Sequence, residues 1–123
     1  MANLIFKEEI YKIIAAIYEV YNELGFGYRE KHYQKAAYRE LIDRGFKVEK
    51  EFTSFTKYKG YPLARYSLDF LIDGKIVVEL KVADDFYKSH ISQILSYLKS
   101  TGLKLGVLVI ITPKGIRFKR VIN

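Results

Sequence analysis

Residues 67–82 read SLDFLIDGKIVVELKV, and this stretch decides the fold of the chain. Two apolar runs flank Asp73-Gly74, a dipeptide that is typical of the turn in a β-hairpin. The pattern predicts antiparallel strands over residues 65–72 and 75–82. The second strand is apolar on both sides of its charged residues, which favours a strand buried inside a sheet.

Three charged side chains of this hairpin form one site only if the turn has an odd number of residues. Glu79 and Lys81 lie on the same face of their strand, because successive side chains alternate between faces. A two-residue loop would send Asp69 to the opposite face. A three-residue loop, for which a left-handed Gly74 is well suited, brings Asp69 to the same face as the other two. We predict the odd-length loop or a bulge.

Such a cluster would suit metal-assisted hydrolysis of a phosphodiester. Two carboxylates and a main-chain oxygen are ligands that Mg²⁺ prefers, and Mn²⁺ should be able to replace it. Bound metal lowers the pKa of water and neutralises charge on a phosphate, while a neighbouring ammonium can orient the nucleophile. A structural ion-pair cluster would have the same spacing, because buried charged groups also pair for structural reasons.

The remaining elements follow from hydrophobic periodicity and from glycine and proline positions. We expect helices over residues 8–24, 29–44 and 86–100, and further strands over residues 46–58, 105–112 and 116–122. A helix between the third and fourth strands makes a parallel crossover. The order ααβββαββ therefore predicts an α/β fold with a mixed sheet flanked by helices.

Length and charge limit the classes of protein to be considered. The 123 residues suit one domain, residues 1–123, and the 21 basic against 14 acidic residues give a charge of +7 that favours a polyanionic partner. The absence of cysteine excludes disulfides and cysteine-ligated zinc. No apolar run is long enough for a membrane span and the first residues do not resemble a secretion leader, so we expect a cytoplasmic protein without a membrane partner.

Three motifs in order resemble those of a known superfamily. Asp69, followed ten residues later by Glu79-Leu80-Lys81, resembles the core of the PD-(D/E)XK nucleases, although Ser67-Leu68 precedes the aspartate where the name-giving proline would stand. Residues 27–33, GYREKHY, resemble the GxxExxY signature of one branch of that superfamily, and residues 93–97, QILSY, resemble its QxxxY helix motif. The resemblance covers most of the chain and implies a restriction-endonuclease-like core.

The resemblance implies a role for each matching residue. A metal ion would be held by Asp69, Glu79, Glu30 and the main-chain oxygen of Leu80. The attacking water would be the target of Lys81. The phosphate or the Lys81 side chain would be positioned by Gln93 and Tyr97.

Helical spacing adds two expectations about polar residues. Glu30 shares a face with the apolar residues of its helix and should point inward, where a carboxylate needs a partner; a helix-dipole role is the alternative. His90 precedes Gln93 by about one turn, and we expect it to be exposed. Basic residues near the end of the chain could contact phosphate, with a solvated surface as the alternative. These are Lys114, Arg117, Lys119 and Arg120.

The sequence thus predicts a metal-dependent nuclease that hydrolyses phosphodiester bonds by activated-water attack, with DNA favoured over RNA as its partner. A close variant is a Holliday-junction-resolvase-like endonuclease, which would act as a homodimer. The alternative from another class is a noncatalytic nucleic-acid-binding or interaction module that retains the fold. Intact Asp69, Glu79, Lys81 and Glu30 speak against that alternative.

Overall fold

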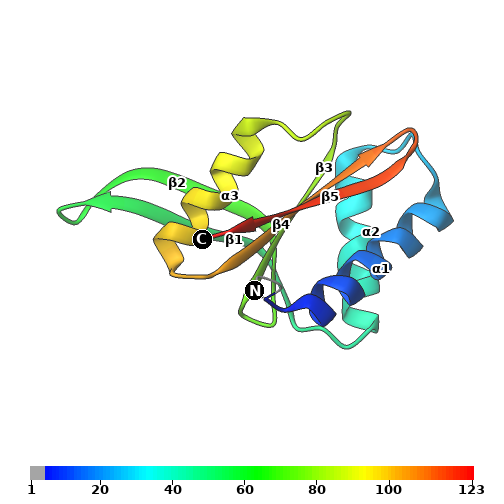
Figure 1. Ribbon diagram of the computed structural model, residues 1–123, viewed down its shortest axis with the longest axis horizontal. Coiled ribbons are helices and arrows are strands. Elements are labelled where there is room, and N and C mark those ends of the chain that lie inside the picture. Colours follow the sequence, from blue (N-terminus) through cyan, green and yellow to red (C-terminus); the bar gives the residue numbers. More distant parts are fainter. Residues whose placement is uncertain (1–4) are drawn as a thin grey trace.

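A five-stranded mixed sheet with the strand order β1-β2-β3-β4-β5 forms the centre of the molecule (Figure 1). The computed structural model describes residues 5–123. The strands are β1 (Val48–Tyr58), β2 (Tyr61–Ile72), β3 (Ile76–Val82), β4 (Leu105–Thr112) and β5 (Gly115–Ile122). The helices are α1 (Lys7–Leu24), α2 (Glu30–Asp43) and α3 (Lys88–Thr101). The predicted order ααβββαββ and the parallel pairing of β3 with β4 are confirmed.

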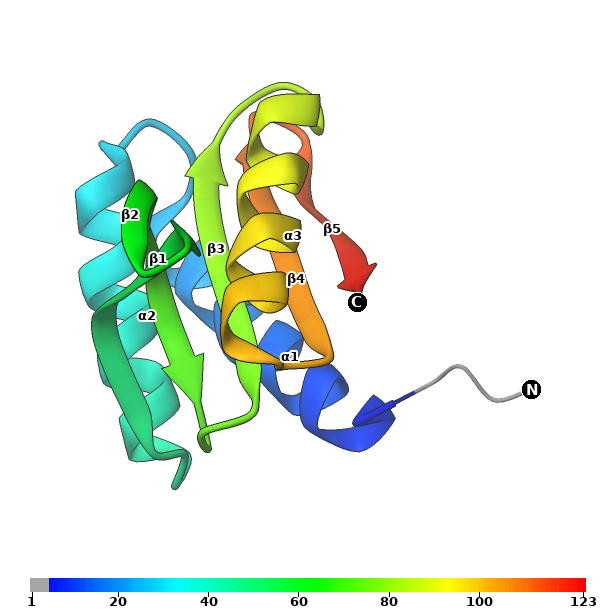
Figure 2. The ribbon, with the colours of Figure 1, turned by 90° about the vertical axis from the view of Figure 1, so that its left-hand side faces the viewer.

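The helices divide the core into two layers, one on each side of the sheet. Figure 2 shows α3 in front of β3 and β4, with α1 and α2 behind. The interior strand β4 is buried along its whole length because it meets apolar residues on both faces. Val107 and Val109 pack toward α1 and α2, whereas Leu108 and Ile110 pack toward α3.

The close packing of α3 on the sheet depends on a glycine in β4. A Cβ atom at Gly106 would lie only 2.5 Å from Cγ2 of Ile94 on α3. Real Cβ atoms do not approach so closely, so a larger residue would push the helix away from the sheet. Within residues 5–123, no helix combines the length and the apolar character needed to cross a lipid bilayer.

The turn between β2 and β3 has the predicted odd length. Ile72 pairs with Ile76, which leaves a three-residue loop at positions 73–75. Asp73 and Gly74 both have positive φ angles, 53° and 68°, and the Lys75 N–H donates to the Ile72 carbonyl over 3.1 Å. This register brings Asp69 and Glu79 to equivalent positions on the two strands.

β1 and β2 extend beyond the rest of the sheet as a two-stranded arm (Figure 1). β2 begins at Tyr61, four residues earlier than the predicted start at position 65. Pro62 therefore lies inside a strand rather than in the expected turn, which is limited to Lys59 and Gly60. The register shifts between Thr56 and Lys57, and this irregularity accommodates a proline that cannot donate to the ladder.

Candidate active site

The candidate site lies where β2 and β3 separate. The last regular pair between them is Phe70 with Val78. Beyond this pair, main-chain N–H groups donate to carboxylates rather than to main-chain carbonyls. The Asp69 N–H donates to Glu79 Oε1 over 3.0 Å, and the Leu80 N–H donates to Asp69 Oδ2 over 2.8 Å. These bonds fix both carboxylates in the gap between the strands, because a buried carboxylate and a buried N–H each need a partner.

Helix α2 covers this gap with two polar side chains one turn apart. Glu30, its first residue, accepts a hydrogen bond from the Val82 N–H at Oε1 over 3.0 Å. Gln34 donates from Nε2 to Asp69 Oδ1 over 3.0 Å. Residues at this helical spacing share a face, so both reach the sheet together.

Lys81 forms ion pairs with a carboxylate on β3 and with one on α2. Its Nζ lies 3.3 Å from Glu79 Oε2 and 3.8 Å from Glu30 Oε2. The pairing is partly shielded from water, since the Lys81 side chain is 24% exposed and that of Glu79 is 4% exposed. The structure thus brings together Asp69, Glu79, Lys81 and Glu30.

The charges of this cluster are not balanced. Burial, and then the nearby charge of Asp69, raises the pKa of Glu79 to about 7. Burial also raises the pKa of Asp69, although the Leu80 N–H opposes that effect. Burial by itself would lower the pKa of Lys81, but the charges of Glu79 and Glu30 outweigh it and raise that pKa. One ammonium faces three carboxylates, and a cation would relieve their repulsion.

The oxygen atoms around Gln34 fit a hard divalent cation. Its Nε2 lies 3.0 Å from Asp69 Oδ1, 3.4 Å from Glu30 Oε2 and 3.5 Å from the Leu80 carbonyl oxygen. Three oxygens from three elements therefore surround one point, and such a donor set suits Mg²⁺ or Mn²⁺. In the described part of the chain, no group of three or more acidic or histidine side chains is arranged to hold a metal ion by itself, and the Leu80 oxygen would add a main-chain ligand to the set.

Gln34 is the site residue that the sequence analysis missed. It touches more of the expected metal ligands than any residue we had named for the site, yet it lies one position beyond the GxxExxY-like segment that ends at Tyr33. The available signal was its spacing, because position 34 is one helical turn after Glu30 and faces the same way.

The predicted residues of α3 have different positions relative to the site. Gln93 donates to the main-chain oxygen of Ser67 over 3.3 Å, which ties α3 to β2 two residues before Asp69. Tyr97 is fully buried in the layer beneath α3, and burial raises its pKa to about 12. A side chain in this position does not reach the surface, where nucleic acid would bind.

His90 differs from the expectation of an exposed side chain. It is half-buried, and Nδ1 is buried with no hydrogen-bond partner among the described residues. Burial lowers the pKa of His90, and the positive charge of Lys81 adds to that effect. The expectation was wrong because α3 begins beside the end of β3, a proximity that helical spacing does not reveal.

The four basic residues near the end of the chain do not form one patch. Arg117 and Lys119 lie on the α3 side of β5, where both approach the ring of Phe86. Arg120 lies on the other side and donates to the main-chain oxygen of residue 5 over 2.9 Å. Lys114 is exposed in the turn before β5. Strand alternation separates neighbouring residues in this way.

The family of the chain follows from a match that contains this whole arrangement. A family model described as PD-(D/E)XK nuclease superfamily matches residues 7–121, from α1 to β5. The chain belongs to the PD-(D/E)XK nuclease superfamily. The match confirms the superfamily and its restriction-endonuclease-like core, whereas membership of the GxxExxY branch stays a prediction.

Two solved structures share this nuclease fold. A crystal structure of SSO0001 has a TM-score of 0.61 and 21% identity, over 76% of this chain and 49% of that one. An alkaline exonuclease, LHK-Exo from Laribacter hongkongensis, has a TM-score of 0.52 and 16% identity, over 70% of this chain and 52% of that one. The chain thus spans about half the length of each. No curated protein matches the sequence.

Proposed function

We propose that this superfamily member is a metal-dependent nuclease that hydrolyses phosphodiester bonds through attack by an activated water. The observation that carries the proposal is the gap between β2 and β3, where Asp69 and Glu79 are held by main-chain N–H groups beside Lys81. Membership of a nuclease superfamily supports it. A purely structural ion-pair cluster would not require this concentration of buried, partly unneutralised carboxylates.

The metal would be held by Asp69, Glu79, Glu30 and the main-chain oxygen of Leu80. When bound, Mg²⁺ lowers the pKa of a coordinated water and neutralises charge on the phosphate. A cation held by Asp69 and the Leu80 oxygen would compete with the amide of Gln34, which donates to both oxygens.

Lys81 has a defined role in this arrangement. Its raised pKa keeps it protonated at neutral pH, so it acts as an ammonium donor rather than as a general base. Contacts with Glu79 and Glu30 hold Nζ beside the carboxylates, where it orients the attacking water and stabilises the negative charge that develops on the phosphate.

Nucleic acid is the proposed substrate, with DNA tested first. The charge of +7 favours a polyanion. Two sets of paired residues across β3, β4 and β5 indicate the face of the sheet from which nucleic acid would approach. Lys81 pairs with Ile110, which pairs with Arg117, and Glu79 is linked through β4 to Lys119 in the same way. Two basic side chains thus share the face of the sheet that carries the candidate site.

A cleavage assay tests the proposal. Wild-type protein with Mg²⁺ or Mn²⁺ should cut at least one of single-stranded DNA, duplex DNA, branched DNA or RNA. Asp69→Ala and Lys81→Ala should each lose roughly 100-fold or more in rate, because each removes a group that acts on the transition state. Asp43→Asn, at an exposed ion pair on α2, is the matched control and should keep its rate.

Two results would overturn the proposal. Equal activity in wild type, Asp69→Ala and Lys81→Ala would indicate a contaminant or another site. Salt-sensitive binding with no cleavage of any substrate would favour the noncatalytic nucleic-acid-binding module.

A further inference from the structure

The arm formed by β1 and β2 differs in charge from the rest of the chain. Residues 53–67 contain Lys57, Lys59 and Arg65 but no aspartate or glutamate, although the chain has 14 acidic residues. Figure 1 shows this arm extending from the body of the molecule beside α3. An arm of this composition attracts a negatively charged partner, because it has no acidic side chain that would repel one.

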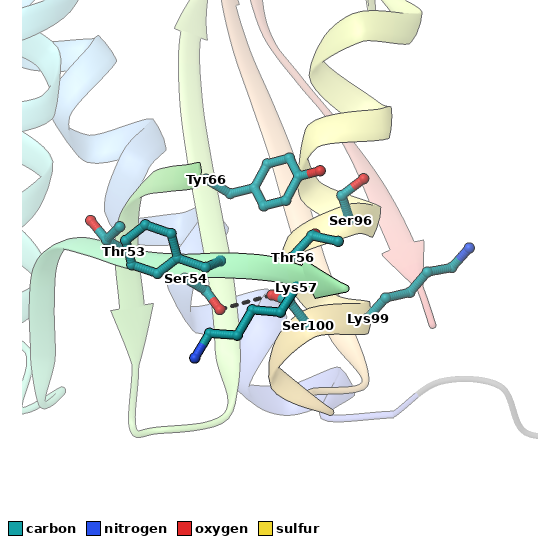
Figure 3. A pocket seen from close by; sticks show the side chains of 9 residues that line it. Thr53, Ser54, Thr56, Lys57, Tyr66, Ser96, Lys99 and Ser100 are labelled. Carbon is teal, nitrogen blue, oxygen red and sulfur yellow. Dashed lines mark hydrogen bonds between the residues drawn. The ribbon is translucent and has the colours of Figure 1, made fainter. Parts of the chain in front are cut away.

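A polar pocket of about 730 Å³ lies between the arm and α3. Hydroxyl groups from both elements line it (Figure 3). Ser54 and Ser100 are hydrogen-bonded across it over 2.8 Å. The phenol of Tyr66 lies near the hydroxyls of Thr56 and Ser96, and their influence lowers its pKa. Such hydroxyls can exchange their mutual bonds for bonds to phosphate oxygens.

Two lysines give this pocket its charge. Lys57 comes from β1 and Lys99 from α3, and Figure 3 shows their side chains extending to different sides of the pocket. Neither lysine forms an ion pair within the described residues, and no described carboxylate lines the pocket. The pocket therefore offers two ammonium groups whose charge is not cancelled locally.

The pocket lies next to the candidate active site along β2 and α3. On α3, Gln93, Ser96 and Ser100 are spaced three and four residues apart and share a face. Gln93 is bonded to the main-chain oxygen of Ser67. Tyr66 precedes Asp69 by three residues on β2, a distance of roughly 10 Å along a strand. A strand of nucleic acid that reaches the carboxylates can therefore continue into the pocket.

We propose that this pocket binds the sugar–phosphate backbone of the nucleic-acid strand next to the bond that is cut. The inference rests on the proposed function and adds where the strand lies. Contacts from ammonium groups and hydroxyls to phosphate oxygens carry no information about the bases, so binding of the backbone here is independent of sequence.

The test compares two double variants with the same change in net charge. Lys57→Glu/Lys99→Glu alters the pocket, whereas Lys7→Glu/Lys12→Glu alters exposed positions on α1, on the opposite side of the sheet. Binding of fluorescent 20-nucleotide single-stranded and duplex DNA is measured with EDTA at several salt concentrations. The pocket variant should bind about tenfold or more weakly, with a salt slope smaller by about 1.5–2. The α1 variant should change affinity by less than about threefold.

Equal weakening of both double variants would show that only net charge matters and would overturn the inference, as would unchanged binding by the pocket variant. Lys57→Gln/Lys99→Gln removes the charges without reversing them, so an intermediate loss is expected if the lysines contact phosphate. Circular dichroism and thermal unfolding check that each variant is folded. If Lys57→Glu/Lys99→Glu does not fold, Lys57→Gln/Lys99→Gln takes its place in the comparison.

The chemistry is tested separately from the pocket. Wild-type protein with Mn²⁺ is assayed on bis(p-nitrophenyl) phosphate and on DNA. Absence of hydrolysis with both substrates would count against the proposed nuclease. The EDTA binding comparison would still decide whether the pocket binds a nucleic-acid backbone.

Discussion

Near the Asp73 turn, β2 and β3 are joined by a regular ladder between apolar residues, whereas one residue beyond Phe70 the same strands separate around buried carboxylates. In the first region, burial and main-chain pairing stabilise the fold. In the second, burial raises the pKa of Glu79 to about 7, so its charged form is disfavoured by the folded state. The difference indicates that the strand pair gives up stability where it holds the carboxylates of the candidate site.

The largest expected effect comes from the apolar region. Ile76 is fully buried in the layer beneath α1 and α2. Ile76→Ala should lower the free energy of unfolding by about 3 kcal/mol, because it removes buried methyl groups and leaves a cavity. Denaturant unfolding measures the loss. Ile42→Ala, at a side chain that is 39% exposed, is the control and should cost under about 1 kcal/mol. If both variants lost the same free energy of unfolding, the apolar region would contribute no more to stability than the surface does.

The opposite sign is expected in the carboxylate region. The pKa of Glu79 rises from an ordinary value of 4.5 to about 7, so the folded state holds the proton more tightly than the unfolded chain. The free energy of unfolding of the metal-free protein should therefore fall by about 3 kcal/mol as pH rises from about 4.5 to 7, and it should stay low above pH 7.

Glu79→Gln should flatten this pH dependence and stabilise the metal-free protein at pH 8 by about 2 kcal/mol, because the amide carries no charge to desolvate. Thermal unfolding in EDTA between pH 5 and 8 measures both effects. Wild-type stability that increases steadily with pH over this range would contradict the account of Glu79.

The smallest effect concerns the helix that covers the gap. Gln34 donates to oxygens that a cation would also bind, so Gln34→Ala removes a competitor. Affinity for Mn²⁺, measured by calorimetry, should increase about three- to tenfold, the equivalent of about one hydrogen bond. Gln93→Ala removes a glutamine that bonds the Ser67 oxygen instead, and it should leave Mn²⁺ affinity unchanged. Weaker Mn²⁺ binding by Gln34→Ala would mean that Gln34 is itself a ligand.

The hairpin could be predicted from sequence because its determinants are local. The Asp73-Gly74 turn and the two-residue period of strand side chains were enough to predict the register that brings Asp69 opposite Glu79. Helical period similarly indicated that Glu30 should face inward. By contrast, the arm was predicted too short, because Pro62 is a turn signal that only the irregular pairing with β1 overrides.

Contacts between distant segments required the tertiary structure. The position of α2 over the gap decides that Gln34, rather than another polar residue of that helix, meets Asp69 and the Leu80 oxygen. The separation of Arg120 from Arg117 depends on which face of β5 meets each helix layer.

The sequence by itself determined the charged groups of the candidate site and the turn that aligns them, because these depend on residue type and on spacing within one hairpin. Only the tertiary structure decided what surrounds those groups. The pKa of Glu79 depends on burial by other elements, and the polar pocket joins Ser54 to Ser100, which are 46 residues apart. Desolvation and contacts between distant segments depend on how the helices pack on the sheet, and no local sequence pattern specifies that packing.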